Sequence, residues 1–232
     1  MPPTATTVGA TLLLSAIVAL AGCTPTPAGR TAGVPATAPA TPTTAPTLPP
    51  GTTLVDIPEA GVSLAIPAGW HHVTGSELAD SSRRADLAAT YPGAGSLLAI
   101  ADEMGDRAAP AFIAVDPSAA TTGGALAPNI AVLVSQPSVS GLLLSVVAGF
   151  VDSGFRDAFD APAPTRDRVE TPMGDAIRLR YDVSAGAATP LEADVWLIGA
   201  PAATVVVSVM GPTDVIAALD PDALIAASRV LP

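Results

Sequence analysis

The sequence predicts an α+β domain, an α/β/α sandwich whose largely antiparallel sheet is flanked by helices. Short apolar segments, several with two-residue alternation, follow one another between clusters of Gly, Pro and Asp. Helical patterns interrupt this series in three places. All 21 acidic residues lie at or after Asp56, so an acidic domain follows an N-terminal region without carboxylates. Strands joined by short turns pair antiparallel, and amphipathic helices cover the faces of the sheet.

A secretory leader is predicted at the N-terminus. Residues 8–21 are uncharged and mostly Leu, Ala, Val and Ile, and they end at Leu20-Ala-Gly-Cys23, which contains the sole cysteine. Their length suits a signal core of roughly 7–15 residues and falls short of the ~20 needed to span a membrane. The arrangement resembles the bacterial lipoprotein signal, which implies cleavage between Gly22 and Cys23 and a diacylglyceryl thioether on Cys23. The alternative is a buried cysteine in an ordinary signal peptide or helix.

Residues 1–10 depart from the usual pattern of a secretory signal, because they contain no Lys or Arg. Such signals usually begin with a positively charged segment. A start codon further upstream would explain it. Thr24 to Thr53 contain eight Pro and ten Thr, with Arg30 the only charge, which predicts a spacer or an O-glycosylated stalk. The expected organisation is therefore a signal at 1–22, a lipidated cysteine and linker at 23–53, and one globular domain at 54–232.

The charge of that domain restricts its partners. From residue 54 onward, nine arginines face 21 carboxylates, which gives a net charge of −12. Phosphate backbones are bound by clustered cations, so the composition disfavours nucleic acid. It also disfavours a domain that lies flat on anionic headgroups.

The first half of the domain is predicted to hold two strands at 54–57 and 62–66, joined by a turn at 58–61. Thr74 with Glu77 fits a capping box, which predicts a helix from there to about Thr90. Three more strands are expected at 96–101, 111–116 and 129–135.

In the second half, Ser138 is the expected cap of a helix that ends near Gly154. We expect its apolar residues to face the core: Val139, Leu143, Val146, Val147 and Phe150, widened by Leu142 and Leu144. Four strands are predicted at 166–171, 175–183, 191–198 and 204–210. Two helices follow at 213–219 and 221–229, the second with Asp220 as its N-cap.

One motif suggests a family. Gly61-Val-Ser-Leu-Ala-Ile-Pro-Ala-Gly-Trp70 is similar to the opening motif of the Mog1/PsbP-like proteins. Together with Leu20-Ala-Gly-Cys23 and the Thr/Pro linker, the chain resembles the mycobacterial LpqN-type lipoproteins of that superfamily. The resemblance implies an α/β/α sandwich and a non-enzymatic role, and it transfers no catalytic residue.

Motifs for catalysis or metal binding are not found. No serine lies in a complete Gly-x-Ser-x-Gly motif, and the adjacent His71 and His72 point apart in a strand or turn, so they rarely chelate one ion. No cofactor or metal is expected. We expect a lipoprotein anchored through Cys23 on the extracytoplasmic side of the cell membrane, with a non-catalytic domain that binds an envelope protein or an apolar ligand. The alternative is a hydrolase of envelope lipids or esters, which needs a buried serine beside His71 or His72.

A candidate binding surface contains Trp196, Arg178 and Arg180. Alternation in 191–198 places Trp196 on the charged face of its strand, and aromatic residues beside Arg are typical of binding hot spots. The alternative is that a helix covers this face and Trp196 packs beneath it. If 175–183 and 191–198 form a hairpin, we expect Arg180 opposite Glu192 and Arg178 opposite Asp194, with Trp196 near Ile177 or Ala176. The competing register sets the carboxylates of Asp182 and Glu192 against each other.

Overall fold

The computed structural model describes residues 48–91, 108–118, 127–183 and 190–232. By its internal contacts, the chain divides into units at 1–43 and 44–232, and the described residues all belong to the second. Gly22, Cys23 and the expected strand at 96–101 therefore lie outside the described residues. Among the helices that are described, none has the length and apolarity required to cross a bilayer.

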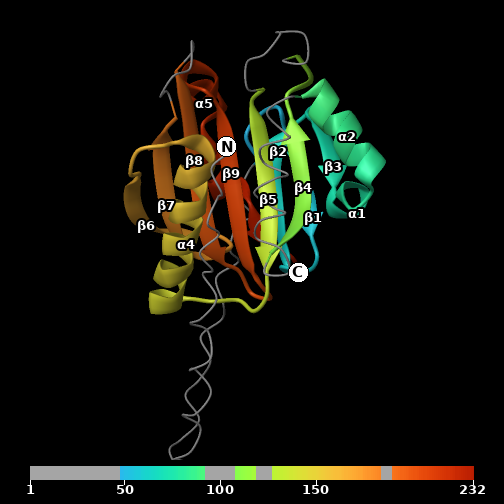
Figure 1. The fold of residues 1–232 in the computed structure, drawn as a ribbon. Coiled ribbons are helices and arrows are strands. Elements are labelled where there is room, and N and C mark those ends of the chain that lie inside the picture. Colours follow the sequence, from blue (N-terminus) through green and yellow to red (C-terminus); the bar gives the residue numbers. More distant parts are fainter. Residues whose placement is uncertain (1–47, 92–107, 119–126, 184–189) are drawn as a thin grey trace, which may run out of the picture. The chain divides into compact units, whose positions relative to one another are not determined.

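The main sheet has seven strands, and every neighbouring pair is antiparallel (Figure 1). Its spatial order is β3-β4-β5-β9-β8-β7-β6. The strands are β3 (His71–Thr74), β4 (Ala109–Val115), β5 (Asn129–Ser135), β6 (Thr165–Thr171), β7 (Gly174–Asp182), β8 (Leu191–Gly199) and β9 (Thr204–Pro212).

A second, smaller sheet has the order β1-β2-β10. Its strands are β1 (Thr52–Ile57), β2 (Val62–Pro67) and β10 (Arg229–Val230). The motif residues Gly61 and Gly69 flank β2 with φ angles of 69° and 85°, a region that glycine enters at little cost. These two glycines let the chain turn sharply at both ends of a strand that is buried along nearly its whole length.

Helices α1 (Gly75–Leu78), α2 (Ser81–Thr90) and α4 (Gly141–Phe159) pack on one side of the main sheet. In Figure 1, α4 runs along β7 and β8, while α1 and α2 lie beside β3 and β4. On the other side, the small sheet together with α5 (Thr213–Leu219) and α6 (Pro221–Ala227) covers β5, β8 and β9. Each side of the main sheet thus has its own apolar core.

The predicted fold class is confirmed: the domain is α+β, with antiparallel sheets flanked by helices. The capping box at Thr74 and Glu77 is confirmed, as is Asp220 as the cap of α6, which accepts a hydrogen bond from the amide of Ala223. The helix predicted from Thr74 to Thr90 is instead two helices, because the Asp80 side chain caps a new one through the amides of Ser82 and Arg83.

Other bounds also differ from the prediction. The helix α4 ends at Phe159 rather than near Gly154. The strands β3 and β10 were not predicted, and β10 ends α6 at Ala227 because Arg229 and Val230 pair with β2. The N-cap of α4 is Ser140 rather than Ser138, whose hydroxyl donates to the carbonyl oxygen of Ala200 at 2.6 Å. Finally, β1 begins at Thr52, two residues before the predicted start of the domain.

Candidate functional site

The predicted register of β7 and β8 is wrong. The structure pairs Arg178 with Trp196, Arg180 with Asp194, and Asp182 with Glu192. The alternation of faces was predicted correctly, since Ala193, Val195 and Leu197 lie in one core and Trp196 in the other. The two registers differ by two residues and keep the same side chains buried. Exposed charge pairs are worth about 0–1 kcal/mol, too little to decide between them.

The observed register builds a buried ion cluster around Asp194, whose side chain is only 2% exposed. The Nη2 of Arg178 donates to Asp194 Oδ2 at 2.6 Å, and Arg180 Nε donates to Asp194 Oδ1 at 3.2 Å. The guanidinium of Arg178 lies over the Trp196 ring, with 5.0 Å between Cζ and the ring centroid, and also bonds Asp222 of α6 at 2.8 Å. The cluster therefore ties α6 to the sheet.

The charges of this cluster shift two pKa values. Burial alone lowers the pKa of Arg178, but its hydrogen bonds and ion pairs with Asp194 and Asp222 outweigh that effect and raise the pKa. Burial raises the pKa of Glu192, and the Asp194 carboxylate raises it further. Trp196 itself is only 1% exposed. Its ring is therefore packed beneath neighbouring elements, as the alternative prediction has it, and does not belong to an open surface. The arrangement holds elements together and leaves Asp194 closed to solvent.

The geometry needed for a serine hydrolase is not found in the described ranges. His71 and His72 are exposed on β3. The buried hydroxyl of Ser63 donates to Asp56, and that of Ser228 donates to the carbonyl of Leu224. The third buried serine, Ser208, has no hydrogen-bond partner. Within 48–91, 108–118, 127–183 and 190–232, no group of three or more His, Cys, Asp or Glu residues is placed to hold a metal ion.

The outer side of α4 is the most unusual surface among the described residues. Leu142, Leu143, Val146 and Phe150 are 79%, 56%, 50% and 68% exposed. Residues spaced by three or four lie on one side of a helix, so these four form a continuous stripe, which we call the α4 apolar face. The prediction that Leu142, Leu143, Val146 and Phe150 face the core is wrong, because α4 packs through Leu144, Ala148 and Phe155.

The buried side of α4 is fixed by aromatic and polar contacts. Phe155 stacks on Tyr181 of β7 with ring centroids 4.3 Å apart. The Tyr181 hydroxyl donates to Asp152 at 3.2 Å, and burial followed by the Asp152 charge raises the pKa of that hydroxyl. These contacts set the rotation of the helix and thereby turn the α4 apolar face outward.

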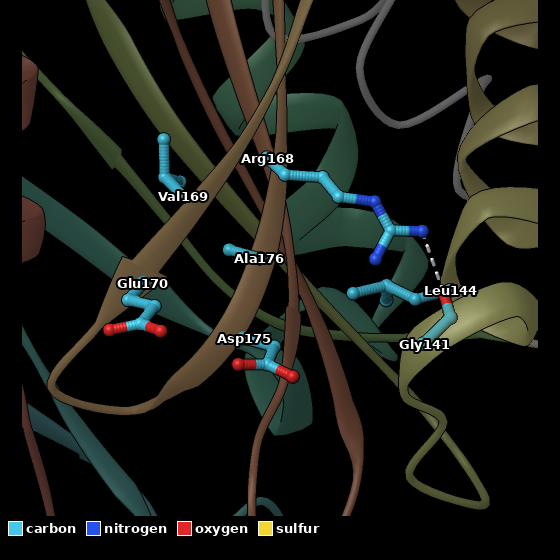
Figure 2. A pocket seen from close by; sticks show the side chains of 7 residues that line it. All are labelled: Gly141, Leu144, Arg168, Val169, Glu170, Asp175 and Ala176. Atoms are coloured by element: carbon cyan, nitrogen blue, oxygen red, sulfur yellow. Dashed lines mark hydrogen bonds between the residues drawn. The ribbon is translucent and has the colours of Figure 1, made fainter.

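The edge strand β6 supplies two cations beside this face. Arg166 Nη2 donates to the carbonyl oxygen of Ser145 at 2.8 Å. Arg168 Nη2 donates to the Ser145 hydroxyl at 2.7 Å and to the carbonyl oxygen of Gly141 at 3.3 Å. Arg168 lines a cleft of about 290 Å³. Figure 2 shows its side chain reaching toward Gly141 at the start of α4. The cleft is lined by Gly141, Leu144, Arg168, Val169, Glu170, Asp175 and Ala176.

The fold is similar to that of a cyanobacterial PsbP. The solution structure of CyanoP from Synechocystis sp. PCC 6803 matches 78% of this chain and 92% of that chain, with 13% sequence identity and a TM-score of 0.48. No family model matches the sequence, and no curated protein does.

Sequence reasoning located α4 but missed its role as a surface. A usable signal was present: the eleven residues from Gly141 to Val151 contain no charged side chain, and the apolar residues among them exceed what one buried face needs. An amphipathic helix with one buried face shows polar residues on the other, so excess apolar residues indicate a second contact.

Proposed function

We propose that the chain is a membrane-anchored cell-envelope lipoprotein of the LpqN type within the Mog1/PsbP-like superfamily, with a non-catalytic domain that binds a protein or an apolar ligand. The anchor is the lipid on Cys23, and the domain lies on the extracytoplasmic side of the cell membrane. The observation that carries the binding role is the α4 apolar face, with four large apolar side chains at least half exposed. Exposed apolar patches of a few hundred Å² mark interaction sites.

The residues around Asp194 support a binding role over a catalytic one. The clustered charges of Arg178, Asp194 and Asp222 satisfy one another and join α6 to β7 and β8. A reacting group must reach its substrate, whereas Asp194 is covered on all sides. The α4 apolar face, in contrast, is exposed to solvent, so a binding partner can bury its side chains.

The anchoring half of the proposal is tested by Cys23→Ala. A thioether needs the Cys23 sulfur, so metabolic labelling with an alkynyl fatty acid should mark the wild-type protein alone. The variant should leave the membrane fraction or accumulate as an unprocessed precursor. A Cys23→Ala protein that is still processed and still held in the membrane would contradict lipid anchoring.

The binding half is tested by site-specific photocrosslinking in intact cells. A photoreactive amino acid replaces Phe150 in one variant and Glu59 in a control, where the exposed β1–β2 turn lies on the other side of the main sheet. Adducts should form from position 150 and not from position 59. Equal adduct yields from both positions would rule out α4 as the binding element.

A further inference from the structure

The area of the α4 apolar face limits what can cover it. Leu142, Val146 and Phe150 follow one another at intervals of four residues, and Leu143 extends the stripe to one side. These side chains together expose on the order of 400 Å² of apolar surface. A symmetric dimer through this face alone would bury about 800 Å², below the roughly 1,200 Å² of a stable interface. A second copy of the chain is therefore a poor occupant.

Charge around the face favours a lipid surface. No residue from Gly141 to Val151 is charged, although the domain carries a net charge of −12. The nearest cations are Arg166 and Arg168, whose guanidinium groups lie against Gly141 and Ser145 at the side of the stripe. Apolar residues flanked by Arg are typical of helices that lie at the boundary between headgroups and acyl chains.

Because the linker keeps the domain close to the membrane, a weak apolar contact is sufficient for docking. Between Cys23 and the first described residue lie 24 residues, which reach about 30 Å as a flexible coil and about 75 Å as extended polyproline II. A domain held at that distance experiences the bilayer at an effective concentration of about millimolar. Burial of a few side chains is then enough to populate a docked state.

We propose that the α4 apolar face docks onto the membrane that holds the Cys23 anchor, with Leu142, Val146 and Phe150 entering the boundary between headgroups and acyl chains. The face is thus the binding surface of the proposed function, and its partner is the lipid surface itself. This inference rests on the proposed function, since it needs the anchor at Cys23. The remaining faces of the domain stay turned away from the bilayer and toward solvent.

The lipidated full chain tests this directly, because acylation blocks Cys23 and leaves an introduced cysteine as the single free thiol. Val146→Cys and the control Glu59→Cys are each labelled with a polarity-sensitive dye and reconstituted into vesicles of phosphatidylcholine and phosphatidylglycerol. The dye at position 146 should shift to the blue and be quenched by brominated lipid, while the dye at position 59 should do neither. Adding Phe150→Ser, or Leu142→Ser as a second variant, should lower the docked fraction roughly tenfold.

Each other outcome has a separate meaning. If the protein floats with vesicles but the dye at position 146 remains as solvent-exposed as that at position 59, docking is overturned and anchoring stands. If the protein does not float, the anchor fails and docking fails with it. If position 146 is shielded in native envelopes but not in vesicles of lipid alone, the occupant is a protein and lipid docking is overturned.

Discussion

At the scale of single residues, Asp194 has the largest predicted effect on stability. Its buried carboxylate accepts hydrogen bonds from Arg178 and Arg180, so Asp194→Asn leaves the Arg178 charge over Trp196 without its main partner. Breaking a buried ion pair from one side costs about 3 kcal/mol. We expect urea unfolding to show a loss of that order. The matched control is Asp222→Asn, because that side chain is 60% exposed and should cost less than about 1 kcal/mol. Equal losses in the two variants would contradict the assignment of Asp194 as the buried centre.

Glu192 gives a pH dependence with a defined sign. Burial and Asp194 raise its pKa in the folded state above the ordinary value of 4.5, while Arg180 and Arg178 oppose the shift. The folded state then binds the proton more tightly than the unfolded state, so this stabilising contribution is present below the unfolded pKa and is lost as pH rises through the folded pKa. We expect the free energy of unfolding of Glu192→Gln to increase relative to wild type as pH rises through that window.

The control for Glu192 has the opposite sign. Hydrogen bonds from the amide and hydroxyl of Thr74 lower the pKa of Glu77. Its contribution is present above the unfolded pKa and is lost as pH falls through the folded pKa. Glu77→Gln should therefore lose stability relative to wild type as pH rises through the window below the ordinary value of 4.5, whereas the window for Glu192 lies above that value. Urea unfolding in a pH series that spans both windows measures the two effects. Parallel curves for the two variants would show that neither carboxylate sets the slope.

At the scale of elements, the orientation of α4 makes a prediction about stability. Leu144→Ala removes a core side chain that is 2% exposed and should cost about 2–5 kcal/mol. Phe150→Ala removes a larger side chain from the same helix, yet it should change stability by no more than about 0.5 kcal/mol in the soluble, unlipidated state. Thermal or urea unfolding of the pair checks this. A larger loss from Phe150→Ala would mean that the helix packs through its predicted face.

The wrong prediction for α4 shows that helical periodicity alone does not determine which face of a helix is buried. Leu143, Val146, Val147 and Phe150 satisfy the spacing of a buried face as well as Leu144, Ala148 and Phe155 do. The choice between them is made by Tyr181 of β7, which stacks on Phe155, and by Arg166 and Arg168 of β6, which hold the first turns. Those partners lie 20 or more residues away along the chain, so local spacing cannot reveal them.

The strands were easier to predict than their pairing. The β5 strand has the predicted bounds, and the side chains of β7 and β8 alternate between the two faces as expected. Register follows from contacts outside the hairpin. A cation above the Trp196 ring, bonded to Asp194 and to Asp222 of α6, stabilises the observed pairing despite Asp182 facing Glu192. Asp222 lies 26 residues beyond Trp196, so the charges within β7 and β8 alone gave the wrong result.

At the scale of the whole molecule, the two sheets depend on each other. The small sheet contributes Ile57, Val62, Leu64 and Ile66 to the core that also contains Trp196. Two of its strands come from the start of the domain, while β10 lies at residues 229–230 and also pairs with β2. The beginning and end of the domain are therefore joined in one sheet, and the loss of either end should unfold the side of the main sheet that they cover.

This dependence sets where the chain can be shortened. A chain that begins at residue 48 keeps β1 and the bonds before it, including Thr52 Oγ1 to the carbonyl of Pro49 and the Ala68 amide to the carbonyl of Gly51, both at 2.7 Å. We expect it to unfold in one cooperative transition at the temperature of the longer mature chain, because the Thr/Pro linker contributes no core.

A chain that begins at residue 58 lacks β1 entirely. The six backbone pairings of β2 with β1 are lost, and Ile57 no longer covers the core. Because β10 is only two residues long, it cannot hold β2 in place by itself. We expect this shorter chain to lose its sharp thermal transition and to bind hydrophobic dyes. A cooperative transition retained at the same temperature would show that the main sheet and its helices fold without the small sheet, and that the domain begins later than β1.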